Sequence, residues 1–477
     1  MQQHLLEVRN NTIGIEHKFQ TPFGEQRILY ADWTASGRLY RPIEEYLMQE
    51  VYPYVANTHT DTTYTGSLMT NLYHDSLQSI KMHVGAGVDD IIISEGSGMT
   101  GVMCKFQRIL GYRLHEKYTD KVTIPHEQRP VVFITHMEHH SNHTSWLETI
   151  CDVAIMPITK DNKIDLVAFD ALLGEYKNRR IKIASVTAAS NVTGVETPYH
   201  EIAGIIHKHD GYCFVDFACS APYVDIDMYP EQEDQYLDAV LFSPHKFLGG
   251  PGSSGVLIFR KELYSNSVPD HPGGGTVLWT SPYDKHHYLN DIEAREDGGT
   301  PAFLQTIRAA KAIELKDYMG TAYIKEQKDL LLNTLWDKVA AMQGVRILEE
   351  GIRNRQGILS LQFENFYFET VVKALNDMFG IQTRGGCSCA GTYSHYLNDI
   401  NQEQSQAIMQ QVVKGNLNAR PGWVRISLHP TMKLSEVEYI AYALQFILDN
   451  EEAVKNLYGQ GDDSLRFSYN QKQAVYA

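Results

Sequence analysis

The sequence contains one lysine, Lys246, whose neighbours suggest a chemical role rather than a place on the surface. Lys246 lies in the segment Ser243-Pro-His-Lys-Phe-Leu-Gly-Gly-Pro-Gly-Ser-Ser-Gly255, after an apolar run and before a glycine-rich turn. Its neighbours are mostly apolar residues or glycine, whereas exposed lysines usually occur in helices or mixed-charge loops. Partial desolvation favours the neutral amine, which an imine-forming nucleophile requires. The segment therefore indicates a nucleophilic lysine, with an ordinary surface lysine as the alternative.

A carboxylate thirty residues upstream supports the first interpretation. Asp216 ends the apolar run at Val215-Asp216-Phe-Ala218. An aspartate at the end of a strand is often only a turn or helix cap. Together with a strand-end lysine, however, it matches the two groups that a pyridoxal phosphate site needs. The lysine forms the Schiff base, and the aspartate keeps the pyridine nitrogen protonated so that the ring accepts electrons.

Two further polar segments follow other apolar runs. In Gly96-Ser-Gly-Met-Thr100, backbone amides and the Thr100 hydroxyl at a helix N-terminus would suit a phosphate. In Ser190-Asn-Val-Thr-Gly194, Asn191 could donate a hydrogen bond to an oxygen of a cofactor ring. Each segment alone is also typical of an ordinary turn. Only their occurrence together supports a cofactor site.

A histidine-rich segment, Glu138-His-His-Ser-Asn-His143, follows the apolar run 131–135. Three histidines in five positions could suggest a metal site. Their spacing is not that of a helical His-Glu-x-x-His motif, and the sequence offers no clear distant ligand. An imidazole lying over a cofactor ring is the favoured interpretation, and no metal is expected.

Two of the six cysteines lie where a packed core thiol is not expected. Most of the six are interpreted as small buried hydrophobic residues, because they are scattered and form no Cys-x-x-Cys pair. Cys387 and Cys389 instead lie in Arg384-Gly-Gly-Cys-Ser-Cys-Ala-Gly391, a polar, glycine-rich stretch that predicts a loop.

The elements that must position these residues follow from the apolar pattern. Strands alternating with amphipathic helices predict a largely parallel sheet, in which ligands bind at the carboxyl ends of the strands. Helices are expected at 165–179 and 198–209. The expected strands are 90–94, 131–135, 152–158, 182–188, 212–218, 239–243 and 254–259.

The pattern changes after about residue 305 and predicts an α+β domain. One long helical stretch is expected at 303–343, and a capping box at Ser435-Glu-Val-Glu438 is expected to open the last helix. The other expected elements are strands at 357–364 and 422–428 and helices at 368–379, 402–418 and 435–449. The predicted units are an N-terminal segment 1–28, a large α/β domain 29–304, a small domain 305–455 and a tail 456–477.

Charge and hydropathy exclude several classes of function. The 477 residues include 42 Lys or Arg and 58 Asp or Glu, a formal net charge of −16. A chain this acidic lacks the positive field that nucleic acids or anionic lipids require. No apolar run reaches the ~18 residues of a membrane span, and the first residues do not resemble a secretory signal. A cytoplasmic globular protein is expected.

The order and spacing of these motifs resemble the class V aminotransferase family of pyridoxal phosphate enzymes, and within it the cysteine desulfurase and selenocysteine lyase group. The resemblance extends from about Leu29 to Asn450. It implies the aspartate aminotransferase fold, type I of the cofactor's transferases, with a mostly parallel seven-stranded sheet in the large domain. Ser-x-His-Lys followed by a Gly/Pro-rich turn is its most specific part.

The resemblance also implies roles for individual residues. Lys246 would be the Schiff-base lysine, and Asp216 would pair with the pyridinium nitrogen. His139 would stack on the ring and take part in catalysis. Arg425 would grip the substrate carboxylate through its guanidinium fork, with a surface ion pair as the alternative. The other implied contacts are Gly98, Met99, Thr100, Ser243 and His245 to the phosphate, Asn191 to the cofactor or substrate, Ala35 to the substrate, and Thr276, in Gly273-Gly-Gly-Thr276, to the phosphate of a neighbouring subunit.

Three features depart from the family pattern. Cys219 stands where the family often has a glutamine beside the ring oxygen. Trp33 and Thr34 interrupt the early Asp32-to-Gly37 stretch. The cysteine loop resembles the loop that presents the desulfurase nucleophile five residues after an arginine, which points to Cys389. Its Cys-x-Cys form is also similar to molybdenum cofactor sulfurases, so Cys387 is a rival or a resolving thiol.

The sequence therefore predicts a homodimeric, pyridoxal phosphate-dependent enzyme that cleaves the C–S bond of L-cysteine, forms a persulfide on a loop cysteine and releases alanine. A protein sulfur acceptor is a candidate partner. Two alternatives remain: a class V aminotransferase, epimerase or C–S lyase without a catalytic cysteine, and a scaffold or sulfur-carrier-binding protein without catalysis.

Overall fold

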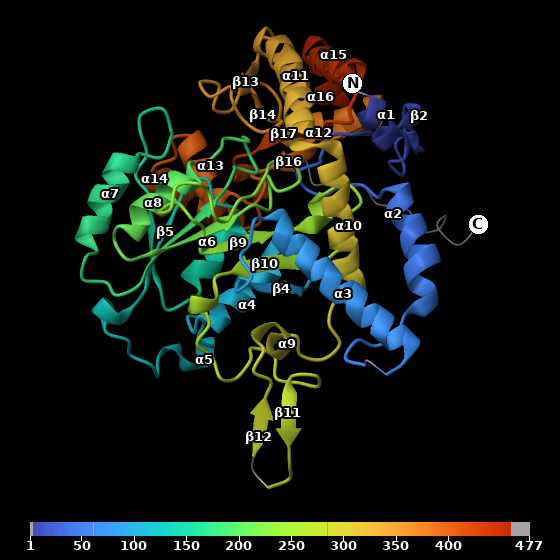
Figure 1. The fold of residues 1–477 in the computed structure, drawn as a ribbon. Helices are drawn as coiled ribbons and strands as arrows, with labels where there is room; N and C mark the ends of the chain where they lie inside the picture. The colour runs from blue at the N-terminus through green and yellow to red at the C-terminus, as the bar shows by residue number, and fades with distance from the viewer. Residues whose placement is uncertain (1–2, 61, 284, 459–477) are drawn as a thin grey trace.

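A seven-stranded sheet forms the centre of the computed structural model, which describes residues 3–60, 62–283 and 285–458 (Figure 1). Its strand order is β4-β10-β9-β8-β7-β5-β6, with β10 antiparallel to both neighbours and every other pair parallel. This confirms the predicted α/β fold class and its mostly parallel sheet. The strands are β4 Ile91–Glu95, β5 Val131–Ile134, β6 Asp152–Ile155, β7 Lys182–Thr187, β8 Tyr212–Asp216, β9 Ala239–Phe242 and β10 Gly255–Phe259.

Both faces of this sheet are covered, so its central strands carry continuous apolar runs. Every residue of β5 is buried. Because successive side chains of a strand point to opposite faces, Val131 and Phe133 enter one core, and Val132 and Ile134 enter the other. The first core also contains residues of α3, α7, α8 and α10, and the second contains α4 and Trp146 of α6. These helices are α3 Tyr64–His83, α4 Met99–Ile109, α6 His140–Leu147, α7 Leu166–Glu175, α8 Tyr199–His207 and α10 Phe303–Met319.

A second, antiparallel sheet lies in the C-terminal part of the chain, in the order β13-β14-β17-β16. Helices α11, α12, α15 and α16 of this part lie at the top of Figure 1. The strands are β13 Val345–Ile347, β14 Ile358–Phe363, β16 Arg384–Gly386 and β17 Trp423–Ser427. The helices are α11 Thr321–Ala340, α12 Phe368–Phe379, α13 Gly391–Leu397, α14 Gln402–Val413, α15 Leu434–Asp449 and α16 Glu451–Tyr458.

Two details of the predicted helices are wrong. The expected single helix over 303–343 is two helices, α10 and α11, because Gly320 has φ 76°, a conformation that glycine adopts without a steric penalty. The helix predicted at 435–449, α15, begins one residue early, at Leu434, so the cap is not at Ser435, and α16 follows it. Glu436 fills the third helical position, and its carboxylate accepts a hydrogen bond from the backbone N–H of Lys433 at 2.9 Å.

The remaining elements are short. The hairpin β11–β12 projects from the body of the molecule (Figure 1). The predicted tail beyond Tyr458 lies outside the described residues, and the predicted domain boundaries stay predictions. No helix of the described ranges is long and apolar enough to cross a membrane. The short helices are α1 Gln3–Asn10, α2 Arg41–Tyr46, α5 Glu116–Thr119 and α9 Ile292–Glu296; the short strands are β1 Lys18–Thr21, β2 Gly24–Arg27, β3 Leu29–Tyr30, β11 Val277–Thr280, β12 His286–Tyr288 and β15 Ile381–Gln382.

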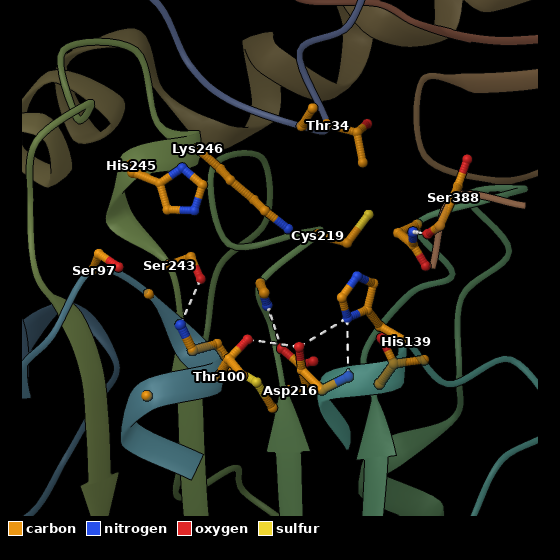
Figure 2. A pocket seen from close by; sticks show the side chains of 18 of the residues that line it. Thr34, Ser97, Thr100, His139, Asp216, Cys219, Ser243, His245, Lys246 and Ser388 are labelled. Carbon is orange, nitrogen blue, oxygen red and sulfur yellow. Dashed lines mark hydrogen bonds between the residues drawn. The ribbon is translucent and has the colours of Figure 1, made fainter. Parts of the chain in front are cut away.

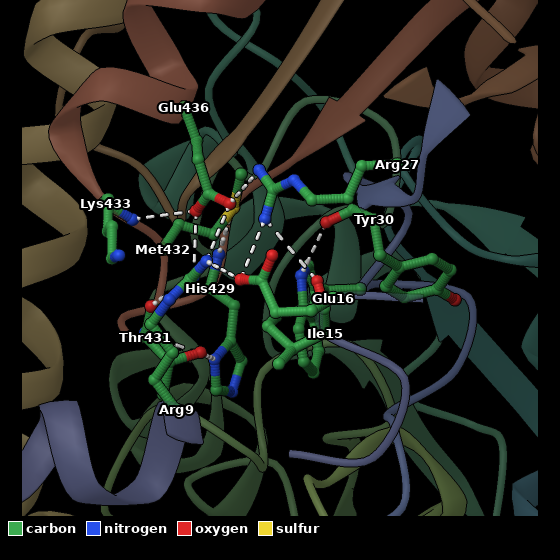
Figure 3. Close-up of polar contacts among 11 residues, drawn as sticks. Arg9, Ile15, Glu16, Arg27, Tyr30, His429, Thr431, Met432, Lys433 and Glu436 are labelled. Carbon is green, nitrogen blue, oxygen red and sulfur yellow. Dashed lines mark hydrogen bonds and ion pairs between the residues drawn. The ribbon is translucent and has the colours of Figure 1, made fainter. Parts of the chain in front are cut away.

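A buried ion-pair cluster ties the start of the chain to α15 (Figure 3). Arg9 of α1 donates two hydrogen bonds of 2.8 Å to the two carboxylate oxygens of Glu436, and Arg27 adds a third at 2.9 Å. Arg9 also donates to the carbonyl of Thr431 at 3.0 Å. The Thr431 hydroxyl contacts the ring of His429, which stacks on Trp33 at a centroid distance of 3.9 Å. The cluster therefore supports the chain segment around Trp33.

Replacing Glu436 with alanine is expected to lower the free energy of unfolding by about 3–5 kcal/mol, because it leaves the buried Arg9 guanidinium without its carboxylate. Glu16 is a matched control, since its carboxylate also contacts Arg9 and Arg27 but is 66% exposed. Glu16→Ala should cost no more than about 1 kcal/mol. Chemical denaturation of both variants measures the difference, and equal losses would contradict the buried role of Glu436.

The ion pair between Glu436 and Arg9 also makes the stability of the protein depend on pH. Burial alone would raise the pKa of Glu436, but hydrogen bonds from Arg9 and Lys433 outweigh it and lower the pKa below 4.5. A carboxyl with a lowered folded-state pKa stabilises the protein above its unfolded pKa. That contribution is lost as the pH falls through the lowered folded value. The stability difference between the wild type and Glu436→Ala should therefore shrink in acid.

Candidate active site

A cavity of about 290 Å³ lies where the parallel strands of the large sheet end, beside β17 of the small sheet (Figure 2). The structure brings most of the predicted site residues together there. Cys387, Cys389 and Thr276 are the exceptions. The predicted residues that line the cavity are Ala35, Gly98, Met99, Thr100, His139, Asn191, Asp216, Cys219, Ser243, His245, Lys246 and Arg425.

Lys246 enters the cavity from a short turn, Pro244–Lys246, that directly follows β9. Its amine points to the middle of the cavity in Figure 2. Burial lowers the pKa of Lys246 below its ordinary value of 10.5, although Cys219 and Asp216 oppose the shift. The turn packs against Gly37, where a Cβ atom would lie 1.9 Å from the Phe247 carbonyl oxygen. The result is a desolvated lysine whose neutral amine is more available than that of a surface lysine.

Asp216 is the last residue of β8 and lies at the floor of the cavity. Burial raises the pKa of its carboxyl to about 6. A hydrogen bond of 2.8 Å from the backbone N–H of Ala218 and the charge of Lys246 partly offset that effect. A buried carboxylate placed here can hold a proton on a ring nitrogen that enters the cavity.

The N-terminus of α4 opens into the cavity and resembles an anion cradle. Its cap residue, Gly98, offers no side chain to the first helical amides. The Met99 N–H donates to Ser243 Oγ at 2.8 Å, and the Thr100 hydroxyl lies 2.6 Å from Ser141 Oγ. A Cβ on Gly98 would lie 3.2 Å from Ser243 Oγ and crowd this space. Helix amides and hydroxyl groups that converge in this way suit a phosphate.

Two histidines of the cavity are held neutral. Burial, followed by the charge of Lys246, lowers the pKa of His139 to about 3 and that of His245 to about 4. His139 Nδ1 accepts from the Ser141 N–H at 3.1 Å, so the ring proton belongs on Nε2. His139 approaches from the side opposite Lys246 in Figure 2, where a planar ring could lie over a bound cofactor.

Arg425 lies in the middle of β17 and is already partly engaged. One terminal nitrogen, Nη2, donates to Asp32 Oδ1 at 2.7 Å, and Nη1 donates to the Asn191 carbonyl at 2.9 Å. Its Nε is buried without a hydrogen-bond partner among the described residues. The arginine is 2% exposed, so the alternative of a surface ion pair is wrong. A carboxylate that enters the cavity can bind this guanidinium by competing with Asp32.

The cysteine loop follows β16 and closes one side of the cavity. Ser388, rather than either cysteine, lines the cavity, together with Arg384. Cys387 packs against the apolar cluster that contains Tyr393 and Trp423. Cys389 is half-buried, at the edge of the site. In this conformation neither cysteine lines the cavity.

Two other predicted contact residues, Cys219 and Thr276, lie in different places. Cys219 lines the cavity, and its thiol lies 3.7 Å from the Ser190 carbonyl; burial raises its pKa. Thr276 lies at the base of the projecting hairpin, where its hydroxyl donates to the Gly273 carbonyl at 2.7 Å. It does not line the cavity of its own chain, so its role in a second subunit stays a prediction.

Sequence reasoning missed three residues of this site. Ser141 orients His139 and contacts Thr100, but it was one polar residue within a histidine run. Ser388 was overlooked between two cysteines. Asp32 belongs to the early family-like stretch, which was the only signal for it. Its pairing with Arg425, 393 residues away in the chain, has no local pattern.

No group of three or more His, Cys, Asp or Glu residues could hold a metal ion in the part of the chain that the structure describes. The three histidines of the run instead face different parts of the molecule. His139 faces the cavity, whereas His140 and His143 contact the backbone or side chain of residues that begin α13.

The comparison with family models finds one match over most of the chain. The model described as Aminotransferase class-V matches residues 29–440. A probable cysteine desulfurase of Staphylococcus aureus is 26% identical over 378 residues, which cover 78% of this chain and 86% of the relative. A probable cysteine desulfurase of Staphylococcus epidermidis is 26% identical over 370 residues, covering 76% and 84%.

Solved structures share the fold. The apo structure of a cysteine desulfurase from Thermococcus onnurineus superposes with a TM-score of 0.73 at 20% identity, covering 93% of this chain and 98% of that one. A cysteine desulfurase from Escherichia coli gives a TM-score of 0.70 at 20% identity, with the same coverage.

Proposed function

The chain belongs to the class-V aminotransferase family, whose members depend on pyridoxal phosphate, and we propose that it is a cysteine desulfurase. The proposed reaction takes sulfur from L-cysteine, stores it as a persulfide on Cys389 and releases alanine. The observation that carries the proposal is the cysteine loop at the edge of a cavity that also contains Lys246 and Arg425. The curated relatives at 26% identity, named as probable cysteine desulfurases, support the same reaction.

The residues of the cavity fit the cofactor. Lys246 offers a buried amine, and Asp216 offers a carboxylate at the floor. The uncapped N-terminus of α4 leaves space for a phosphate that a Cβ on Gly98 would crowd. We propose that Thr100, Ser243 and His245 complete the phosphate contacts, and that His139 lies over the ring. Pyridoxal phosphate, when bound, supplies the electron sink that stabilises a carbanion at the substrate α-carbon.

The substrate carboxylate is proposed to bind Arg425. Arg425 lines the cavity, and binding of the carboxylate at Nη2 requires Asp32 to give way. A guanidinium presents two parallel donors to a carboxylate, which fixes the orientation of the amino acid. The substrate α-carbon then lies toward Lys246, whose Nζ accepts the α-proton as a general base.

The sulfur step is proposed to use Cys389. Its thiolate attacks the substrate sulfur, and an S–S bond forms as the substrate C–S bond breaks. The electron pair of the broken bond stays on the β-carbon, which takes up a proton and becomes the methyl group of alanine. The balance is one thiol and one cysteine consumed, and one persulfide and one alanine formed, with no external oxidant. Because Ser388 now lines the cavity, Cys389 must swing inward for this attack.

Two further proposals concern the subunit assembly and the acceptor of the sulfur. We propose a homodimer in which Gly273–Thr276 of one subunit completes the phosphate site of the other, as the family resemblance implies. Thr276 is buried at the base of a projecting hairpin, outside the cavity of its own chain. A second proposal is that a separate protein accepts the persulfide sulfur.

The products formed from L-cysteine test the proposed reaction. The purified holoenzyme should form alanine and one sulfane sulfur per alanine, and a thiol reductant should release that sulfur as sulfide. Pyruvate with ammonia would indicate a C–S lyase, a keto acid would indicate an aminotransferase, and a D-amino acid would indicate an epimerase. Any of these products without alanine would reject the proposed desulfurase.

A further inference from the structure

Three histidines that do not line the cavity all face α13, the helix that directly follows the cysteine loop. His136 packs edge-on against Tyr393 and Tyr396, with ring centroids 5.2 Å from each. His140 and His143 lie on adjacent turns of α6 and contact the first two residues of α13. We call His136, His140 and His143 the histidine clamp.

Within the histidine clamp, His140 contacts the cysteine loop through two hydrogen bonds. Its backbone N–H donates to the Cys389 carbonyl at 2.8 Å. Its Nε2 accepts from the Gly391 N–H at 3.0 Å. These two bonds hold the peptide units on both sides of Ala390. A single residue of α6 therefore fixes the exit of the loop.

The α13 helix depends on this contact because it has no cap of its own. Its cap position is Ala390, which has no side-chain hydrogen bond to the helix. The first amides of a helix lack partners within the helix, and an alanine cannot supply one. The ring of His140 takes the place of a capping side chain. A Cβ on Gly391 would lie 3.1 Å from Nε2, so glycine leaves the space for the ring.

His143 adds a second contact of the same kind. Its Nδ1 lies 3.0 Å from the Thr392 hydroxyl. Burial lowers the pKa of both His140 and His143, which favours the neutral rings that can accept hydrogen bonds. His139, the remaining histidine of the run, points into the cavity. The histidine run thus connects the wall of the cavity to the helix behind the cysteine loop.

The loop conformation itself requires outside support. Ser388 has φ 52° and Cys389 has φ 59°, so two consecutive residues with side chains are left-handed. Such residues persist only where the surroundings hold them. Asn191 Nδ2 donates to the Ser388 carbonyl at 2.7 Å, and His140 holds the Cys389 carbonyl. The two carbonyl contacts fix the backbone from which the Cys389 thiol projects.

We propose that His140 is a positioning residue for Cys389: its ring fixes the end of the cysteine loop, so that the thiol makes its approach to the substrate from a defined backbone. The proposal rests on the proposed function in one respect, that Cys389 is the nucleophile. His140 touches neither the cavity nor the substrate, and it acts through the Gly391 amide. It is distinct from His139 in this respect, although the two are adjacent in the chain.

Two variants separate the ring contact from general stability. His140→Leu removes the acceptor at similar size, whereas His140→Gln places an amide oxygen near the position of Nε2 and keeps the acceptor. Both retain the backbone N–H to Cys389. In the holoenzyme, His140→Leu should lower kcat about five- to tenfold, which lies within the range that the loss of one ordinary hydrogen bond would give. KM for L-cysteine should stay within about twofold, because Arg425 and Lys246 are unchanged.

The second readout does not need turnover. Alkylation of Cys389 by iodoacetamide, measured by peptide mass spectrometry of the holoenzyme, reports the access and mobility of the thiol. Cys104 of α4, outside the cavity, is the reference thiol in the same molecule. The ratio of the Cys389 rate to the Cys104 rate should change about fivefold in His140→Leu and return to the wild-type ratio in His140→Gln.

The outcomes are decisive in each direction. Restoration by glutamine of both kcat and the alkylation ratio supports the positioning role. An unchanged alkylation ratio in His140→Leu, or equal defects in the leucine and glutamine variants, overturns it. A holoenzyme that forms no alanine but still shows the change in alkylation would refute the proposed function and leave the loop contact established.

Discussion

Replacing Lys246 with alanine is expected to abolish covalent attachment of the cofactor and to lower the rate of alanine formation by about 10²- to 10⁴-fold or more. The lysine is proposed both to hold pyridoxal phosphate and to accept the α-proton, and a positioned general base alone contributes about this much. Lys246 is buried in the cavity, and its lowered pKa makes the neutral amine available. No other lysine lines the cavity among the described residues.

Borohydride reduction followed by peptide mapping measures the attachment directly. The wild type should carry the reduced cofactor on Lys246, and the alanine variant should carry none. Lys316→Met is a matched control, because Lys316 is also buried, with a pKa lowered by burial to about 8, but lies outside the cavity. Cofactor attached to a different lysine in the wild type would reject the assignment of Lys246.

The lowered pKa has a consequence for pH. Capture of the cofactor by the apoprotein requires the neutral amine, so its rate should rise with pH and level off below 10.5, the ordinary lysine value. Burial has the largest effect, and the charges of Arg425 and Arg384 act in the same direction. A midpoint at the ordinary value would mean that the cavity is well solvated.

Replacing Cys389 with serine is expected to lower desulfuration by at least about 10³-fold, because a hydroxyl cannot form a stable bond to the transferred sulfur. Cofactor binding should survive, since Cys389 does not line the cavity. The matched variant is Cys387→Ser, two positions away. Its thiol packs against the apolar cluster behind the loop, so this variant should keep activity of the same order as the wild type.

The rate of alanine formation from L-cysteine, with the cofactor spectrum as a check of folding, compares the two variants. If Cys387 is the nucleophile instead, the two variants should exchange their effects. Full activity in a variant that lacks both cysteines would support a class V enzyme without a catalytic thiol.

The large sheet could be predicted closely from the sequence because its strands are continuous apolar runs. Val131–Ile134 is buried on both faces, and such a run ends where polar residues begin. The site residues follow the same logic, since Asp216 ends β8 and Lys246 lies in the short turn after β9. A pattern confined to adjacent residues is enough to place them at one edge of a parallel sheet.

Other features depend on contacts between distant segments and leave no local pattern. The break at Gly320 was missed because the apolar period continues through it into α11. Asp32 approaches Arg425 only because the early segment pairs with β17, through a bridge between Asp32 and Ser427. The orientation of the cysteine loop was also not predictable, because Asn191 and His140 hold it from other elements.

The histidine run 139–143 is a further case in which contacts with a distant segment could not be predicted from the local sequence. Its composition indicated either a metal site or a stacking ring, and only His139 was given a role. The structure turns His140 and His143 toward α13 because they lie on the helix α6, whereas His139 caps that helix and faces the cavity. The sequence could not show which helix they would face.

The location of the transferred sulfur shows directly whether Cys389 is the nucleophile. The wild-type holoenzyme should be mixed with one equivalent of L-cysteine, without reductant, then alkylated and digested for mass spectrometry. The peptide containing Cys389 should gain one sulfur atom, in proportion to the alanine formed, and fragment ions should place it on Cys389 rather than Cys387. Alanine formed with no added sulfur on either cysteine would contradict this role of Cys389.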